Sequence, residues 1–147
     1  MSQLHVRPIR VSLERLYKDK IDMSDYTKGK AEDKENKFLT RSLAAYSLQY
    51  YADIDDTIAS KCVVDNYDDN GIDAIYYDKA GKKLYIVQSK WINDGNGCPS
   101  SGDTKKFADG TRDLVNCRWE RFNKKINEKK NDINIALDDV NTRIVSI

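Results

Sequence analysis

The stretch DDNGIDAIYYDKAGKKLYIVQSKW, residues 68–91, decides the fold. It predicts two strands, 72–78 and 83–91, because both runs are rich in Ile, Val and Tyr. The letters DKAGKK between them predict a tight turn centred near residues 80–81. Three polar side chains interrupt these apolar strands, and they are Asp73, Gln88 and Lys90. Polar side chains in such positions form a site or satisfy one another.

The length of the turn decides whether these three side chains meet. A loop of two or four residues pairs Asp78 with Lys83, and counting outward then places Asp73 opposite Gln88. Cross-strand partners point to the same face, with Cβ atoms about 4.5–5.5 Å apart. Lys90 shares that face because it lies two residues after Gln88. The sequence therefore predicts one polar cluster, whereas an odd-length loop would separate Asp73 from the other two.

The remaining sequence alternates helical and strand patterns. The strongest helix is predicted at 32–54, where apolar residues recur at helical spacing. The other predicted elements are a helix at 10–21, a connector at 22–33, a strand at 57–64, a loop at 93–103, helical segments between 105 and 139, and a strand formed by TRIVSI at 142–147. This order predicts an α/β fold with a mixed sheet, in which an antiparallel hairpin is followed by a helical crossover to another strand.

Composition narrows the class of protein. The chain has 147 residues, of which 39% are hydrophobic and 33% charged, and this is typical of a folded domain with its own core. No apolar run approaches the roughly 18 residues of a membrane span, and the first twenty residues lack the apolar core of a secretory signal. Three widely spaced cysteines predict free thiols in a reducing, cytoplasmic compartment. A single histidine argues against a structural zinc site.

Charge is unevenly distributed along the chain. Residues 51–78 hold eight acids and one base, a net charge of −7, whereas residues 104–130 hold nine bases and four acids, a net charge of +5. This pattern fits a metal site beside a phosphate-binding surface, and it equally fits solvated helix faces. The bases predicted to bind nucleic acid are Lys105, Lys106, Arg112, Arg118, Arg121 and Lys124.

Glu35 is predicted as a fourth member of the polar cluster. It lies three and four positions before Phe38 and Leu39, on the apolar face of the predicted helix, where a carboxylate needs a partner or a cation. Two carboxylates and an amide oxygen suit Mg²⁺ or Mn²⁺, and a lysine beside them can stabilise charge on a phosphate or orient a water. This combination suits phosphodiester hydrolysis. The alternative is an internal salt-bridge network in which Asp73 pairs with Lys90.

These residues resemble a known superfamily. GIDA followed by YIVQSKW is similar to the PD-(D/E)xK nucleases in the QxK variant of Mrr-like restriction endonucleases, and it looks especially like the N-terminal domain of the abortive infection phage resistance (AIPR) family. The resemblance covers residues 32–91 and extends to 105–147 only by the order of elements. It implies a restriction-endonuclease-like core with helices on both faces of the sheet. We place this nuclease-like domain at 34–147, after an N-terminal helical arm and connector at 1–33, and expect it to lead a longer protein.

The resemblance also implies an activity and its residues. Asp73, Gln88 and Glu35 would hold Mg²⁺ or Mn²⁺, and Lys90 would complete the catalytic set of a DNA endonuclease in prokaryotic antiphage defence. DNA is the expected partner, RNA stays open, no membrane is expected, and cutting both strands suggests a homodimer. Gln88 stands where most members have an acid, so metal binding depends more on Glu35. Without Glu35 the domain would bind nucleic acid without cutting it. A third reading is an interaction domain whose polar residues are structural.

Overall fold

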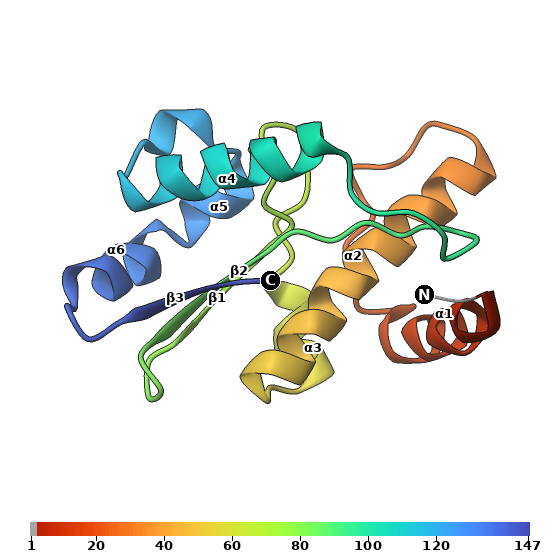
Figure 1. The fold of residues 1–147 in the computed structure, drawn as a ribbon, viewed down its shortest axis with the longest axis horizontal. Coiled ribbons are helices and arrows are strands. Elements are labelled where there is room, and N and C mark those ends of the chain that lie inside the picture. Colours follow the sequence, from red (N-terminus) through yellow and green to blue (C-terminus); the bar gives the residue numbers. More distant parts are fainter. Residues whose placement is uncertain (1–2) are drawn as a thin grey trace. The chain divides into compact units, whose positions relative to one another are not determined.

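The computed structural model describes residues 3–147, with side chains from residue 5 onward. The described chain forms two compact units, and each unit is discontinuous in sequence (Figure 1). The helical unit extends to Val63 and resumes at Ser89–Pro99. The sheet unit combines Val64–Gln88 with Ser100–Ile147. Each is described by itself below.

The predicted domain boundary between residues 33 and 34 falls inside the helical unit. Residues 1 and 2 of the predicted N-terminal arm lie outside the described residues.

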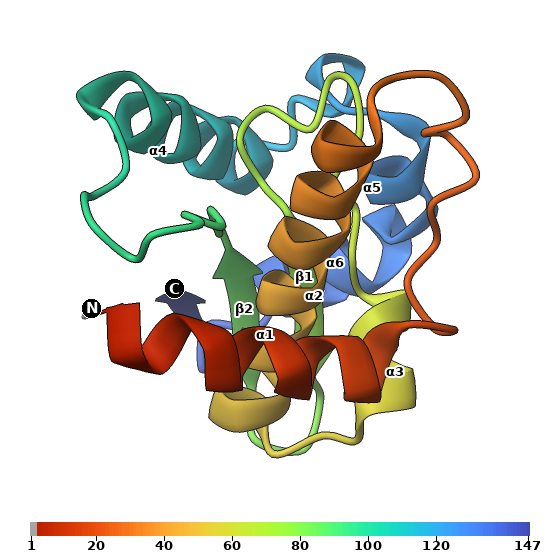
Figure 2. The same cartoon turned by 90° about the vertical axis from the view of Figure 1, so that its right-hand side faces the viewer.

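The helical unit contains three helices. They are α1 (Gln3–Tyr17), α2 (Ala31–Ala52) and α3 (Asp56–Lys61). Helix α1 lies across α2 and packs against it, as Figure 2 shows. The fully buried residues Leu13 and Tyr17 of α1 and Leu39 and Leu48 of α2 belong to the core. The long helix predicted at 32–54 is confirmed, and so is a helix over most of 10–21.

A buried arginine fixes the connector before α2. The side chain of Arg41 is fully buried, and its Nη1 and Nη2 donate to Oδ1 and Oδ2 of Asp25 at 2.7 and 2.6 Å. Nη1 also donates to the carbonyl of Asp22 at 2.6 Å. Such a two-point contact suits the planar guanidinium. The polar connector is therefore held to α2 from within the unit.

The strand predicted at 57–64 is wrong, because these residues begin as helix α3. Asp53 adopts a left-handed conformation that ends α2, with φ of 52°. The Asp55 side chain then accepts a hydrogen bond from the Ile58 amide at 2.7 Å and caps α3. The apolar residues that favoured a strand therefore lie in a short capped helix and in the non-helical segment Cys62–Val64 that follows it.

The sheet unit is built on a three-stranded mixed sheet. Strand β1 (Ala74–Asp78) pairs antiparallel with β2 (Lys83–Val87), and β2 pairs in parallel with β3 (Arg143–Ser146). The order is β1-β2-β3. The predicted hairpin is confirmed, with its register from Asp78–Lys83 to Ala74–Val87, and so is the helical crossover to a third strand. Both strands are shorter than predicted, because β1 begins at Ala74 rather than at residue 72 and β2 ends at Val87 rather than at residue 91. The fold is thus mixed α/β with a small sheet.

Helices form the rest of the sheet unit. They are α4 (Ser101–Val115), the short 3₁₀ turn η1 (Trp119–Arg121), α5 (Lys124–Glu128) and α6 (Lys130–Asp138). Helix α4 begins with a reciprocal cap, in which Ser100 accepts from the Asp103 amide and the Asp103 carboxylate accepts from the Ser100 amide. Ile75, Leu84 and Ile86 of the hairpin pack with Leu114 and Ile133 in one core. Between residues 3 and 147, no helix combines the length and apolar character needed to cross a membrane.

Candidate metal centre

Three buried aspartates meet in the loop that leads into β1. Asp65, Asp69 and Asp73 are spaced four residues apart, and each is less than a tenth exposed. One carboxylate oxygen from each lies within 4.8 Å of the others. Asp73 was predicted as a ligand from the sequence, whereas Asp65 and Asp69 were not. The features of the sequence that could have indicated these two residues are the acidic run over residues 51–78 and the regular spacing within it.

The backbone of this loop folds around the carboxylates. The carbonyl of Asp73 accepts from the amides of Val64 and Asp65 at 2.8 and 3.1 Å. Oδ1 of Asp69 accepts from the Gly71 amide at 2.8 Å. Asn123, the cap of α5, donates through its side chain to the Val64 carbonyl at 3.0 Å. The loop is therefore closed by hydrogen bonds at both ends.

Two glycines let the loop lie directly on α4. Gly71 has φ of +80°, and a Cβ there would lie 2.9 Å from the Phe107 amide nitrogen. Gly110 lies in α4, where a Cβ would lie 2.0 Å from the Asn70 carbonyl oxygen. Both contacts are with backbone, which cannot move aside as a flexible side chain can. Only glycine at each position permits this close approach.

The carboxylates fit a divalent cation. Mg²⁺ binds oxygen ligands at about 2.0–2.1 Å, so ligands on opposite sides of the ion lie about 4.2 Å apart. The candidate oxygens lie up to 4.8 Å apart, so the three side chains would rotate toward one another to bind a single ion. Hard oxygen ligands also match the chemistry of Mg²⁺ and Mn²⁺. One cation already lies at the edge of this group, because Nζ of Lys106 is 3.0 Å from Oδ1 of Asp69.

Gln88 lies near the end of the hairpin, and its side chain contacts α4. The ladder ends at Ala74–Val87, one pair before Asp73 and Gln88. The Asp73 amide donates instead to the Val87 carbonyl at 2.8 Å, and the Gln88 amide donates to the Ile147 carbonyl at 2.9 Å. Nε2 of Gln88 donates to the carbonyl of Asp103 at 3.2 Å. The hairpin register therefore does not continue as a regular ladder to this pair.

Glu35 and Lys90 belong to the helical unit. Glu35 is exposed rather than at a buried helix edge, and it forms an ion pair with Arg10 of α1. Arg10 also donates to Glu14 at 3.0 Å, and that hydrogen bond is the main reason that the pKa of Arg10 is raised. Because Asp73 and Gln88 lie in the sheet unit, the predicted cluster of four residues stays a prediction.

The segment that carries Lys90 is anchored to α2. Oγ of Ser89 donates to the Thr40 carbonyl at 2.8 Å, and the Trp91 amide donates to Oγ1 of Thr40 at 3.3 Å. The exposed Lys90 and its neighbour Trp91 line a cavity of about 150 Å³ that also contacts Leu43. This anchoring holds Lys90 at a defined place in the helical unit.

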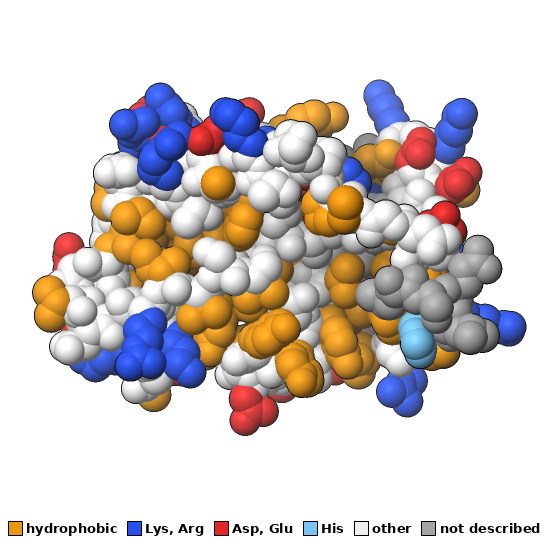
Figure 3. Space-filling view, in the orientation of Figure 1, with side chains coloured by type: hydrophobic (Ala, Val, Ile, Leu, Met, Phe, Trp, Pro, Cys, Tyr) orange, Lys and Arg blue, Asp and Glu red, His pale blue; other side chains and the backbone are white. Residues whose placement is uncertain are grey.

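The six bases predicted to bind nucleic acid all lie in the sheet unit, and each has an acidic partner. The ion pairs are Lys105 and Arg112 with Asp109, Lys106 with Asp69, Arg118 and Arg121 with Asp113, and Lys124 with Glu128. Hydrogen bonds, from Lys105 to Asp109 and from Arg121 to Asp113, are the main cause of the lowered pKa of each acid. Figure 3 shows Lys and Arg side chains gathered over the C-terminal end of α4 and the connection after it.

A scan against protein-family models found no match, and searches of curated proteins and of solved structures found none either. The resemblance to PD-(D/E)xK nucleases therefore rests on the motif residues alone.

Proposed function

We propose that this chain is a metal-dependent nuclease domain that hydrolyses phosphodiester bonds of DNA. The observation that carries the proposal is the group of three buried carboxylates at the start of β1, in which Asp73 stands beside Asp65 and Asp69. The proposal includes the relation to PD-(D/E)xK nucleases, a restriction-endonuclease-like core, and a role in antiphage defence in the prokaryotic cytoplasm. It assigns the ion to Mg²⁺ or Mn²⁺, held by Asp73 and its two neighbours.

The roles of the side chains follow from their chemistry. A bound Mg²⁺ would supply a nucleophilic water and stabilise the charge that develops on the phosphate. Asp65, Asp69 and Asp73 would hold the ion, and Lys106 would move from Asp69 toward a phosphate oxygen. Glu35 and Lys90 belong to the helical unit, so their roles in the sequence motif, Glu35 at the ion and Lys90 at the scissile phosphate, stay expectations. Gln88 can coordinate through Oε1 while its Nε2 holds α4.

The test is cleavage of supercoiled plasmid by the purified chain in Mg²⁺, in Mn²⁺ or in EDTA. We expect nicking that EDTA stops, that Asp73→Asn lowers at least about 100-fold, and that Lys90→Ala lowers comparably. Asp139→Asn is the matched control, because Asp139 is an aspartate of the sheet unit that pairs with Lys82 outside the carboxylate group. Calorimetric titration with Mn²⁺ gives a second readout, and Asp69→Asn should weaken binding. Metal-independent cleavage, or none by the wild type, would contradict the proposal.

A second candidate is a DNA-binding module that does not cut. It is favoured by the cations that already pair with two of the acids, Lys106 with Asp69 and Arg10 with Glu35. These ion pairs compete with a metal for the same oxygens. Salt-sensitive DNA binding without Mn²⁺ uptake or cleavage would favour this candidate over the nuclease.

A further inference from the structure

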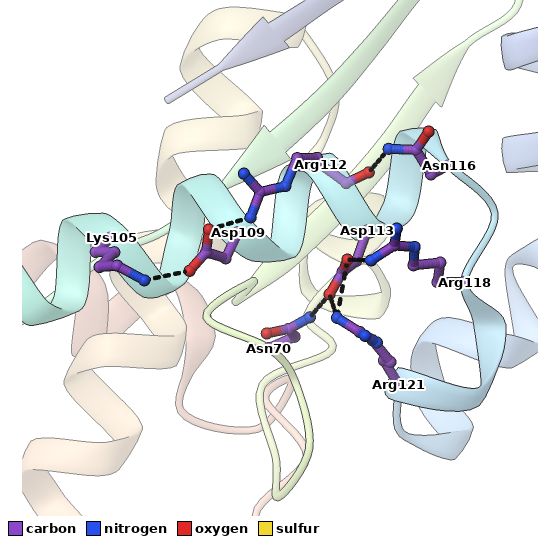
Figure 4. Close-up of polar contacts among 8 residues, drawn as sticks. All are labelled: Asn70, Lys105, Asp109, Arg112, Asp113, Asn116, Arg118 and Arg121. Carbon is purple, nitrogen blue, oxygen red and sulfur yellow. Dashed lines mark hydrogen bonds and ion pairs between the residues drawn. The ribbon is translucent and has the colours of Figure 1, made fainter.

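A buried aspartate holds two arginines side by side after α4. Asp113 is 3% exposed, and its carboxylate accepts from Nη1 of Arg118 at 3.1 Å and from Nη1 of Arg121 at 2.9 Å. Nδ2 of Asn70 donates to the same carboxylate at 3.1 Å. Figure 4 shows the three side chains converging on Asp113 from two different segments. The buried Asp113 carboxylate therefore positions both guanidinium groups.

The backbone around the two arginines is fixed as well. Cys117 adopts a left-handed conformation with φ of 56°, which ends α4 and turns the chain back. The Arg118 amide then donates to the Asp113 carbonyl at 3.0 Å, and the Arg121 amide donates to the Arg118 carbonyl at 3.1 Å. Because both backbone and side chains are held, little conformational entropy is left to lose when a ligand binds.

The pair keeps unused binding capacity. The side chains of Arg118 and Arg121 are 47% and 53% exposed, and each contacts Asp113 through Nη1. A guanidinium carries five N–H donors in a planar fork, which suits the oxygens of a phosphate group. One carboxylate balances only one of the two positive charges. The pair thus combines a net positive charge with donors that face solvent.

The pair is also connected to the candidate metal centre. Asn70, which donates to Asp113, directly follows Asp69 in the loop that carries the three carboxylates. The same loop is pressed onto α4 at Gly110. A phosphate held by the two arginines would therefore lie on the same loop–helix assembly as the carboxylates, within one unit.

We propose that Arg118 and Arg121, braced by Asp113, form a clamp for one backbone phosphate of duplex DNA. This inference rests on the proposed function only for the identity of the ligand. Lys105 and Arg112 share Asp109 in a similar way, but Asp109 is one-third exposed, and both bases are more exposed than the two clamp arginines. They are thus less firmly held, and the clamp is assigned to the pair on the buried acid.

The test is the affinity of the full chain for a short fluorescent DNA duplex, measured by anisotropy in EDTA over a range of salt. We expect Arg118→Gln and Arg121→Gln each to weaken binding about tenfold and to lower the salt slope by about one. Arg121→Lys keeps the charge but loses the fork, so an intermediate loss is expected. The matched control is Arg143→Gln. Arg143 is exposed and lies beside Lys83 in the register of β2 and β3, at the turn end of the sheet and away from Asp73.

The melting temperature of each variant separates a loss of folding from a loss of binding. Losses no larger than that of Arg143→Gln would overturn the clamp, and tighter binding to RNA of the same sequence would overturn its assignment to DNA. Because the assay contains no metal, it is independent of cleavage. A clamp that binds as expected in a protein that cuts no plasmid would leave this inference standing and remove the proposed nuclease activity.

Discussion

At the scale of single residues, Asp139 links stability to pH. Its Oδ2 accepts from Nζ of Lys82 at 2.6 Å, and its Oδ1 accepts from the Asn141 amide at 2.9 Å. The hydrogen bond from Lys82 is the main cause that lowers the pKa of Asp139 to about 2, from an ordinary value of 3.8. The folded state therefore binds this proton more weakly than the unfolded state does. The stabilisation is present above pH 4, approximately, and is lost as pH falls toward about 2.

Asp139→Asn should remove this dependence. Between about pH 5 and pH 2, we expect the melting temperature of the wild type to fall further than that of the variant, because the variant has no carboxylate to protonate. Thermal unfolding followed by circular dichroism across this range measures the difference. If the melting temperatures of the two proteins fall in parallel as pH is lowered, the ion pair between Asp139 and Lys82 contributes nothing to the pH dependence of stability.

The residues of the candidate site were predictable only in part. Asp73 could be singled out because it is a charged residue beside an apolar strand, whereas the turn sets the register only as far as Ala74–Val87. Asp65 and Asp69 reach the same place through a loop with left-handed residues at Asp68, Asn70 and Gly71, and no periodic pattern encodes such a path. Asp113 was hidden for another reason. It lies in a basic segment, and only the fold reveals that it organises the bases around it.

At the scale of elements, α4 contains a glycine that helix propensity cannot explain. Alanine is normally favoured over glycine inside a helix by about 1 kcal/mol. Gly110→Ala should nevertheless lower stability, because the new Cβ would lie 2.0 Å from the Asn70 carbonyl oxygen. The loop would have to move off α4, so we expect the free energy of unfolding to fall by about 1–3 kcal/mol. Mn²⁺ affinity should fall with it.

Gly102 in the same helix provides the matched control. A Cβ at that position would meet only Oγ of Ser100 at 3.6 Å, which is ordinary contact. Gly102→Ala should therefore leave stability unchanged or raise it by up to about 1 kcal/mol. Urea unfolding of both variants measures the contrast. If the two substitutions change the free energy of unfolding equally, the close approach of the loop to α4 does not contribute to stability.

Elements with a strong local pattern were predicted, and those set by competing local signals were not. Helix α2 runs for 22 residues with acids in its first turn, and the β1–β2 hairpin has both strand composition and a turn. Helix α3 is only six residues long, and Ile58 within it together with Val63 and Val64 after it favours a strand on composition. The decisive signal was the capping residue Asp55, because a cap determines the start of such a short helix.

At the scale of the whole molecule, each unit contains one tryptophan. Trp91 lies in the helical unit and Trp119 in the sheet unit. The chain passes from one unit to the other three times, after Val63, Gln88 and Pro99. Adjacent residues are tied to different units, since the Gln88 amide donates to Ile147 and the Ser89 hydroxyl donates to Thr40. Composition and periodicity carry no signal for such interleaving.

We therefore expect the two units to unfold together. Trp91→Phe leaves Trp119 as the reporter of the sheet unit, and Trp119→Phe leaves Trp91 as the reporter of the helical unit. In each variant, the urea midpoint from tryptophan fluorescence should equal the midpoint from circular dichroism. A midpoint that differs between the tryptophan signal and circular dichroism in either variant would indicate that one unit unfolds first.

The interleaved chain path also constrains the order in which the protein can mature on the ribosome. The first three helices emerge early, but the segment that Thr40 anchors emerges only after the β1–β2 hairpin. The hairpin in turn waits for its parallel partner β3, which is made more than fifty residues after β2. The helical unit therefore cannot finish folding until the β1–β2 hairpin of the sheet unit has been made, whereas the sheet unit cannot finish until β3 has been made. A nascent chain halted before β3 would expose the unfinished surface of the sheet unit to chaperones and proteases.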